Sequence, residues 1–319
     1  MLETLTSMLP LLAAAVTATA TFRAGTLLAD GIVPLQDKND RENTVRGLML
    51  LESIFQRLTK ELGEDHIEVL RTMDAMALAR ARLGERKRSE GIMNSFANIA
   101  SGMMDKKNYK GAIEALSMLV PTRERILGPD DLATLRSLAR LGVSLNRTGK
   151  NVEAERIFRK VAEGRERTLG SEDPLTMDAR GCQGIALFCL NEHERARELL
   201  EPIAGPLALV KDKVFSELMC MPSTGRVLSA LGNYGPARDL LSRSAALARK
   251  NLGPSHNTTL CREEELAKAL EGLGEIEAAA KLLEKVASES EKGPGADPER
   301  AKRAGERLEK LLKDRDDSE

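Results

Sequence analysis

The sequence predicts an all-α fold, a solenoid of stacked antiparallel helix pairs, and a repeating spacing of residues carries this prediction. Five alanines follow one another at intervals of 42, 42, 41 and 41 residues: Ala112, Ala154, Ala196, Ala237 and Ala278. Four residues after each alanine stands a bulky apolar residue. Twelve residues before the first four stand Ala100, Gly142, Gly184 and Gly225, whereas the fifth repeat has Leu266 there. A fixed period near 42 residues indicates tandem copies of one supersecondary unit, and such arrays favour binding over catalysis.

The composition supports a folded helical chain. Hydrophobic residues make up 42% and charged residues 30% of the 319 residues, which allows a core beneath a well-solvated surface. Residues that favour helices dominate, and no β-branched or aromatic run suggests a sheet. A formal net charge of −1 gives no global attraction to nucleic acid or to an anionic membrane, so we expect neither as a partner.

The cysteines favour a reducing compartment. Cys182, Cys189, Cys220 and Cys261 include no close C-x-x-C pair, so we expect neither a disulfide framework nor a zinc knuckle. The expected location is therefore cytoplasmic, with N-terminal targeting as an open alternative.

Residues 1–42 are expected to form an N-terminal helix and linker. Residues 8–20 are apolar or small, and Ala18-Thr19-Ala20 resembles a signal cleavage site. Glu3, however, stands where a signal peptide carries positive charge, and Arg23 ends the apolar run before it could span a bilayer. A packed helix is the preferred interpretation, and a targeting peptide and a membrane-associated segment are the alternatives.

A divergent helical hairpin is expected over residues 43–85. Gly63 and Gly128 are 65 residues apart, one repeat plus about one additional helix. Segments 43–61, 65–83 and 88–104 each have helical periodicity, so one helix has no assigned partner.

The repeat array is expected over residues 86–292, with about five units. Around Ala154, one helix is predicted over 131–147 and a second over 152–168. Gly149 suits the left-handed conformation that ends the first helix, and Ser171 or Asp173 can cap the next one. A small residue on each helix lets the pair cross closely, and the large residue one turn later fills the space beside the crossing.

Prolines mark an irregular stretch over 202–225. Pro202 and Pro206 are expected to kink or shorten the second helix of the Ala196 repeat. Pro222 is predicted to fall inside the next first helix, and Pro121 to interrupt an earlier second helix. Asp212 stands where the junction between repeats should carry glycine. Drift in a tolerant repeat and a bend that shapes a binding surface both explain this stretch.

The C-terminal segment, residues 293–319, is expected to form a capping helix and a charged tail. Residues 297–314 are charged nearly all round, with a thin apolar stripe of Ala301, Ala304, Leu308 and Leu311. An open solenoid needs such a solvated helix at its end.

The junctions between repeats carry the family resemblance. Ile126-Leu127-Gly128-Pro129-Asp130-Asp131 recurs as Thr168-Leu169-Gly170-Ser171-Glu172-Asp173 and as Asn251-Leu252-Gly253-Pro254-Ser255-His256. Together with the turn Lys150-Asn151-Val152-Glu153-Ala154, these motifs resemble the tetratricopeptide repeat family, and more narrowly its kinesin light chain type. The resemblance implies a right-handed superhelix whose first helices line a concave groove that binds peptides or partner helices.

No constellation for chemistry emerges, so the predicted catalytic, metal and cofactor sites are none. His66 and His256 occupy junction positions, and Asp130-Asp131 begins a helix, which acids favour. Cys182, Cys189 and His193 could share one helix face, but His193 is expected to follow a turn, which argues against a metal site.

The predicted function is a non-enzymatic scaffold or adaptor that binds a protein partner and no evident small-molecule substrate. The groove positions implied by the resemblance, counted back from each alanine, are Asn94, Ser101, Arg136, Asn146, Arg147, Asp178, Arg226 and Glu263. An ordinary solvated face is the alternative interpretation of these residues. The alternative function is a structural subunit that enters a larger assembly by its convex surface; an all-helical enzyme is a third, less favoured class.

Overall fold

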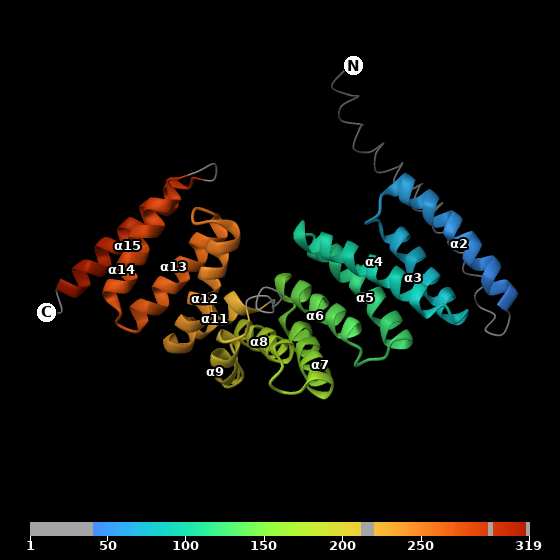
Figure 1. Ribbon diagram of the computed structural model, residues 1–319, viewed down its shortest axis with the longest axis horizontal. Helices are drawn as coiled ribbons and strands as arrows, with labels where there is room; N and C mark the ends of the chain where they lie inside the picture. The colour runs from blue at the N-terminus through green and yellow to red at the C-terminus, as the bar shows by residue number, and fades with distance from the viewer. Residues whose placement is uncertain (1–40, 212–219, 293–295, 317–319) are drawn as a thin grey trace, which may run out of the picture. The chain divides into compact units, whose positions relative to one another are not determined.

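The fold is all-α. The computed structural model describes residues 41–211, 220–292 and 296–316, and every regular element in these ranges is an α-helix (Figure 1). The thirteen helices of this described part are α2 (Arg41–Leu62), α3 (Ile67–Arg82), α4 (Arg86–Asp105), α5 (Tyr109–Ile126), α6 (Leu132–Arg147), α7 (Asn151–Leu169), α8 (Pro174–Cys189), α9 (His193–Ala208), α11 (Met221–Ala230), α12 (Tyr234–Leu252), α13 (Asn257–Gly272), α14 (Ile276–Ser290) and α15 (Pro298–Asp316). The predictions for residues 1–40 and for Asp212 lie outside the described residues.

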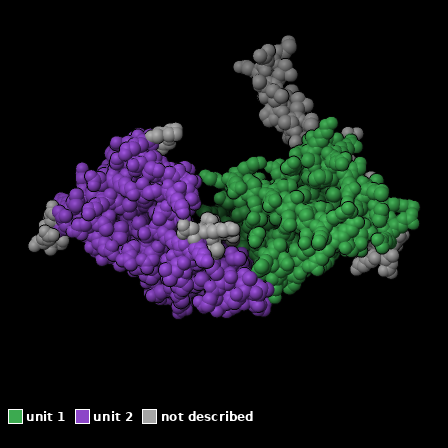
Figure 2. Space-filling view, in the orientation of Figure 1, with its two compact units in different colours: residues 1–149 green, residues 150–319 purple. Residues whose placement is uncertain are grey.

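The chain divides into two compact units, which meet in sequence between Gly149 and Lys150 (Figure 2). In unit 1, α2 packs on α3, α3 on α4, α4 on α5 and α5 on α6. In unit 2, sequential packing likewise joins α7 to α8, α8 to α9, and α11 through to α15. Packing between sequential helices is the arrangement of a helical repeat protein, and it confirms the predicted fold class.

Helix α3 resolves the question of the unassigned helix near the N-terminus. It packs against α2 and α4. It also packs against α5, which is the second helix of the repeat formed by α4 and α5. In unit 2, the second helices α9 and α12 pack against each other in the same way. Helix α3 therefore takes the place of a second helix, and α2 precedes it as its partner.

The turns form as their residues predict. The junction residues Gly63, Gly128, Gly170 and Gly253 have φ angles of 90, 107, 95 and 93°. These left-handed angles suit glycine at the end of a helix. Three residues after each of these glycines stands a residue whose side chain accepts a hydrogen bond from a backbone N–H of the next helix. These residues are His66, Asp131, Asp173 and His256. Both junction histidines therefore cap helices, as their positions suggested.

The contact between small and large residues is direct in unit 2. A Cβ atom on Gly184 would lie 2.5 Å from Leu200 Cδ2, and one on Gly225 would lie 2.7 Å from Leu241 Cγ. Glycine therefore allows the first and second helices of these repeats to approach. The repeat alanines of the first four units, Ala112, Ala154, Ala196 and Ala237, are fully buried.

The predicted register of the fifth repeat is wrong by one residue. Ala278 is exposed and Leu282 is only half-buried, whereas Ala279 and Leu283 are buried. Twelve residues before Ala279 stands Ala267, which is also buried. The fifth unit therefore keeps the pattern of the others, and the interval that precedes its alanine is 42 residues rather than 41.

Two of the proline predictions need correction. Helix α5 runs through Pro121 without a break, and Pro222 lies in the first turn of α11, where its missing N–H removes no helical hydrogen bond. Helix α9 has 16 residues, whereas α7 and α12 have 19 each, and it ends two residues after Pro206. The expected shortening of this helix is therefore observed.

Helix α15 packs on α14 and ends the described part of the chain. Two alanines of its apolar stripe, Ala301 and Ala304, are buried. Arg300, also buried, donates to Asn257 Oδ1 at 2.7 Å and so ties this helix to α13 as well.

Candidate functional site

All eight predicted groove residues lie on first helices, but they differ in accessibility. Asn94, Arg136, Arg147 and Arg226 are exposed, and Ser101 and Asn146 are half-buried. Asp178 and Glu263 are buried. The exposed and half-buried residues, apart from Arg226, belong to α4 and α6 in unit 1. An accessible polar face on these two helices is therefore the candidate site.

Arg123 of α5 is buried beneath this face and contacts it. The sequence analysis did not identify this residue. Its guanidinium donates to Asn94 Oδ1 and Ser137 Oγ, each at 2.7 Å. It also donates to the carbonyl oxygens of Met93 at 3.0 Å and Ala133 at 2.7 Å. Arg123 thus connects α4 with α6 and fixes the side chain of Asn94.

The face is rich in positive charge. Burial and the neighbouring charges of Arg140 and Arg136 lower the pKa of Arg123 to about 10, although Asp131 opposes the shift. Burial and the charge of Arg136 also lower the pKa of Arg140, against the effect of Asp105. Arg123, Arg136 and Arg140, called the arginine cluster below, therefore repel one another, and an incoming anion would relieve this repulsion.

A repeat-spaced pair of arginines could have revealed Arg123. Arg123 and Arg165 are 42 residues apart, and each stands eleven residues after a repeat alanine. Arg165 donates to the carbonyl oxygen of Leu175, the position that corresponds to Ala133 in the next repeat. The same position in two repeats therefore ties a second helix to the first helix that follows.

Glu263 and Asp178 have internal partners. Two nitrogens of the Arg249 guanidinium bind the two carboxylate oxygens of Glu263, at 2.9 and 3.0 Å, and Lys285 Nζ lies 3.7 Å away. Asp178 accepts the backbone N–H of Cys220 at 2.9 Å and lies 3.8 Å from an Arg165 nitrogen. Both carboxylates therefore serve packing between helices, and we leave them out of the accessible face.

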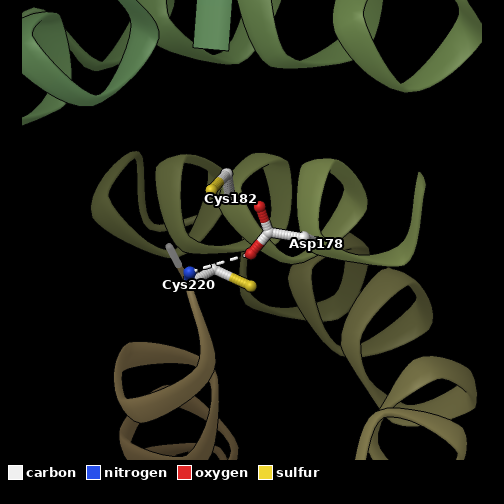
Figure 3. A group of neighbouring side chains, drawn as sticks. All are labelled: Asp178, Cys182 and Cys220. Atoms are coloured by element: carbon white, nitrogen blue, oxygen red, sulfur yellow. Dashed lines mark hydrogen bonds between the residues drawn. The ribbon is translucent and has the colours of Figure 1, made fainter. Parts of the chain in front are cut away.

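Asp178 also belongs to a buried cluster with Cys182 and Cys220 (Figure 3). One oxygen and the two sulfur atoms of these residues all lie within 4.8 Å of one another. Asp178 and Cys182 are on α8, and Cys220 directly precedes α11. Among the described residues, this Asp178–Cys182–Cys220 cluster is a group of side chains whose ligand atoms lie close enough together to hold a metal ion.

Cys182, Cys189 and His193 do not share one helix. Cys189 is exposed at the end of α8, and His193 begins α9 with its ring 5.1 Å from that of Phe188. The buried cluster has no signature in the spacing of neighbouring cysteines, because Cys182 and Cys220 lie far apart in sequence. Asp178 and Cys220 are 42 residues apart, so the repeat period was the signal that could have paired them.

Residues 134–175 and 219–258 match the tetratricopeptide repeat family. These two stretches of the chain are similar to tetratricopeptide repeats. The first stretch starts within α6 and ends at the start of α8, so it spans one complete 42-residue period of the array.

Two solved structures are similar to this chain. One is a crystal structure of nearly identical TPR-like repeats from Podosopora anserina, in a protein provisionally assigned as a kinesin light chain. It is 24% identical and covers 62% of this chain and 95% of its own, with a TM-score of 0.48. A single-substitution variant of the same protein is also 24% identical, covers 62% and 94%, and has the same TM-score of 0.48. Among curated proteins, none matches the chain.

Proposed function

We propose that this protein is a non-enzymatic scaffold that binds a peptide or a helix of a partner protein in a groove lined by the first helices of its repeats. The observation that carries the proposal is the arginine cluster together with Asn94, which lie on α4, α5 and α6. Arg136 is exposed there, and Arg123 holds the side chain of Asn94 in place. Preformed polar groups on a rigid helical face bind a partner with little loss of conformational entropy.

The charge of this face favours an acidic segment of the partner. Burial is the largest cause of the lowered pKa of Arg123 and of Arg140, and neighbouring arginine charges lower both pKa values further, against the effects of Asp131 and Asp105. Carboxylates on a bound segment would form charge-assisted hydrogen bonds with these guanidinium groups. Binding should therefore weaken as salt is raised, because exposed charges are screened.

Affinity purification with mass spectrometry tests the proposal, comparing the wild type with the Arg136→Glu/Arg147→Glu variant. Both arginines are exposed, so reversing their charge should leave the fold intact. The matched control is Lys110→Glu/Arg156→Glu, which reverses two exposed charges on the second helices α5 and α7. We expect a discrete set of partners that the first variant loses and the control keeps.

An assembly subunit is the second candidate function. Met49 and Leu50, adjacent on α2, are 65% and 47% exposed, and apolar side chains of this size favour contact with another protein. In that case a stable complex would survive the Arg136→Glu/Arg147→Glu substitutions, and Met49→Ser/Leu50→Ser would disrupt it. A complex kept by the charge variant would reject binding at the arginine cluster.

We further propose a cytoplasmic location. All four cysteines are free in the structure, including the neighbouring Cys182 and Cys220, which a reducing compartment would keep as thiols.

A further inference from the structure

We propose that Asp178, Cys182 and Cys220 form a binding site for one thiophilic divalent cation of the Zn²⁺ class. This site is separate from the arginine cluster, since it lies in unit 2 and its ligands are buried. Two cysteine sulfurs and one carboxylate oxygen are ligands that Zn²⁺ uses in proteins. The inference is independent of the proposed scaffold function.

The spacing of the three ligands fits a tetrahedral ion with small adjustments. Asp178 and Cys182 are four residues apart on α8, so their side chains lie on one face of that helix. Two sulfurs that each lie about 2.3 Å from a tetrahedral Zn²⁺ are about 3.8 Å apart. Because the ligand atoms already lie within 4.8 Å of one another, shifts of about 1 Å or less would complete the geometry.

The packing around Cys220 provides room for its sulfur and a further oxygen atom. A Cβ atom on Gly181 would lie 2.5 Å from Cys220 Sγ and 3.1 Å from Thr224 Oγ1, so glycine makes this space. Thr224 Oγ1 is buried and lies within hydrogen-bonding reach of the Cys220 thiol. This hydroxyl, directly or through water, is suited to the fourth coordination position.

The charges balance both without and with the ion. Arg165 of α7 lies 3.8 Å from Asp178 and compensates its carboxylate when both thiols are protonated. An ion of charge +2 that displaces one proton from each thiol leaves the total charge unchanged. The step is Zn²⁺ plus two thiols giving a zinc dithiolate and two protons. Neutrality in both states avoids the cost of a buried uncompensated charge.

The thiols should make binding dependent on pH, because each thiol must lose its proton before its sulfur binds the ion. Where both thiols are protonated in the metal-free protein, the release of two protons should raise the affinity about 100-fold per pH unit.

The test uses the full chain with Cys189→Ser/Cys261→Ser, which removes the two exposed thiols and keeps the buried pair. This variant is titrated with Cd²⁺ under a non-thiol reductant, with thiolate-to-metal charge-transfer absorption as the readout. We expect one ion per chain, two protons released per ion, and a higher melting temperature in the presence of the ion. Failure to bind Cd²⁺, or release of fewer than two protons, would overturn the proposal.

Ligand variants in the same background locate the ion. Cys182→Ser and Cys220→Ser should each abolish the charge-transfer band, and Asp178→Asn, which can still accept the Cys220 N–H, should weaken binding. Circular dichroism of the metal-free variants establishes whether each one folds. Undiminished Cd²⁺ binding by a folded Cys182→Ser or Cys220→Ser variant would reject the site. If neither variant folds, the proposal is judged by the number of ions bound and protons released by the Cys189→Ser/Cys261→Ser variant.

Discussion

Replacing Gly184 by alanine should destabilise unit 2, although alanine is the better helix former. Gly184 lies within α8, where its missing side chain leaves room for Leu200 of α9. A Cβ atom there would lie 2.5 Å from Leu200 Cδ2 and 2.6 Å from its Cγ. Because Leu200 is fully buried, its side chain cannot move outward to solvent, and the two helices would have to separate.

The size of the effect follows from two opposing contributions. Alanine in place of glycine within a helix stabilises by about 1 kcal/mol. Overpacking a dense core costs roughly 1–3 kcal/mol, and carbon–carbon contacts are normally about 3.5–4.0 Å. Since the new contacts with Leu200 are about 1 Å too short by that measure, we place this site at the upper end of the range. The net expectation is a loss of about 2 kcal/mol in the free energy of unfolding.

Urea denaturation followed by circular dichroism measures this loss against a matched glycine. Gly305 lies within α15 of the same unit, and a Cβ atom there would meet no atom within 4 Å. Gly305→Ala should therefore stabilise by about 0.5–1 kcal/mol through helix propensity alone. The packing argument is refuted if Gly184→Ala is as stable as the wild type or more stable.

A double-mutant cycle with Leu200→Ala identifies the contact. Leu200→Ala alone removes the crowding atoms and should cost about 2–5 kcal/mol as a core truncation. In that background Gly184→Ala should no longer be destabilising, which gives a favourable coupling of about 2 kcal/mol between the two substitutions. Persistence of the Gly184→Ala penalty without the leucine would assign it to another cause.

Three further predictions concern single side chains. Arg123→Met should cost about 2–4 kcal/mol in urea denaturation, because four hydrogen bonds from a buried charged donor are lost; an effect below about 1 kcal/mol would contradict the bridging role. Burial raises the pKa of Asp74 above its ordinary value of 3.8, against a hydrogen bond from Thr122 and the charge of Arg125. The native state therefore binds this proton more tightly than the unfolded state, so its contribution to stability falls as pH rises through the folded pKa. Asp74→Asn should therefore be more stable than the wild type at neutral pH, and its stability should depend less on pH. Urea titrations at several pH values measure this, and a variant less stable than the wild type at neutral pH would contradict it. Lys107 has a φ of 59°, so Lys107→Gly should raise the stability by about 1 kcal/mol, and an unchanged or lower midpoint in urea would oppose this.

The repeat period predicted the fold because each unit must solve the same packing problem. The left-handed turn at Gly149 and the helix cap at Asp173 both form, since they depend on residues close in sequence. Register in the fifth repeat was harder to predict, because Ala278 and Ala279 are adjacent and only the packing shows which one faces the neighbouring helices. Adjacent alanines carry no signal that separates them in sequence.

The accessible site was predictable only in part. Asp178 and Glu263 were predicted as groove residues because the family resemblance assigns their positions to the groove. Each instead meets an arginine, Arg165 or Arg249, from the end of the preceding second helix. An arginine 13 or 14 residues before an acidic residue, across a junction, is the sequence pattern that could have indicated burial.

The corrected register localises the irregularity of the array. The residues that turn each first helix into its second helix are Lys107, Gly149, Asn191, Gly232 and Gly274, and their intervals are 42, 42, 41 and 42 residues. One residue is therefore missing, and only in the interval between Asn191 and Gly232. The repeat alanines give the same intervals once Ala279 replaces Ala278.

The missing residue does not alter either neighbouring helix crossing. Gly184 and Leu200 are 16 residues apart, as are Gly225 and Leu241, and both pairs keep their close contact. The loss therefore falls between Leu200 and Gly225. Cys220, which brings its sulfur and its backbone N–H to Asp178, lies within this interval. Because both crossings are kept while this interval is one residue shorter, the chain can change there without cost to the repeat packing on either side.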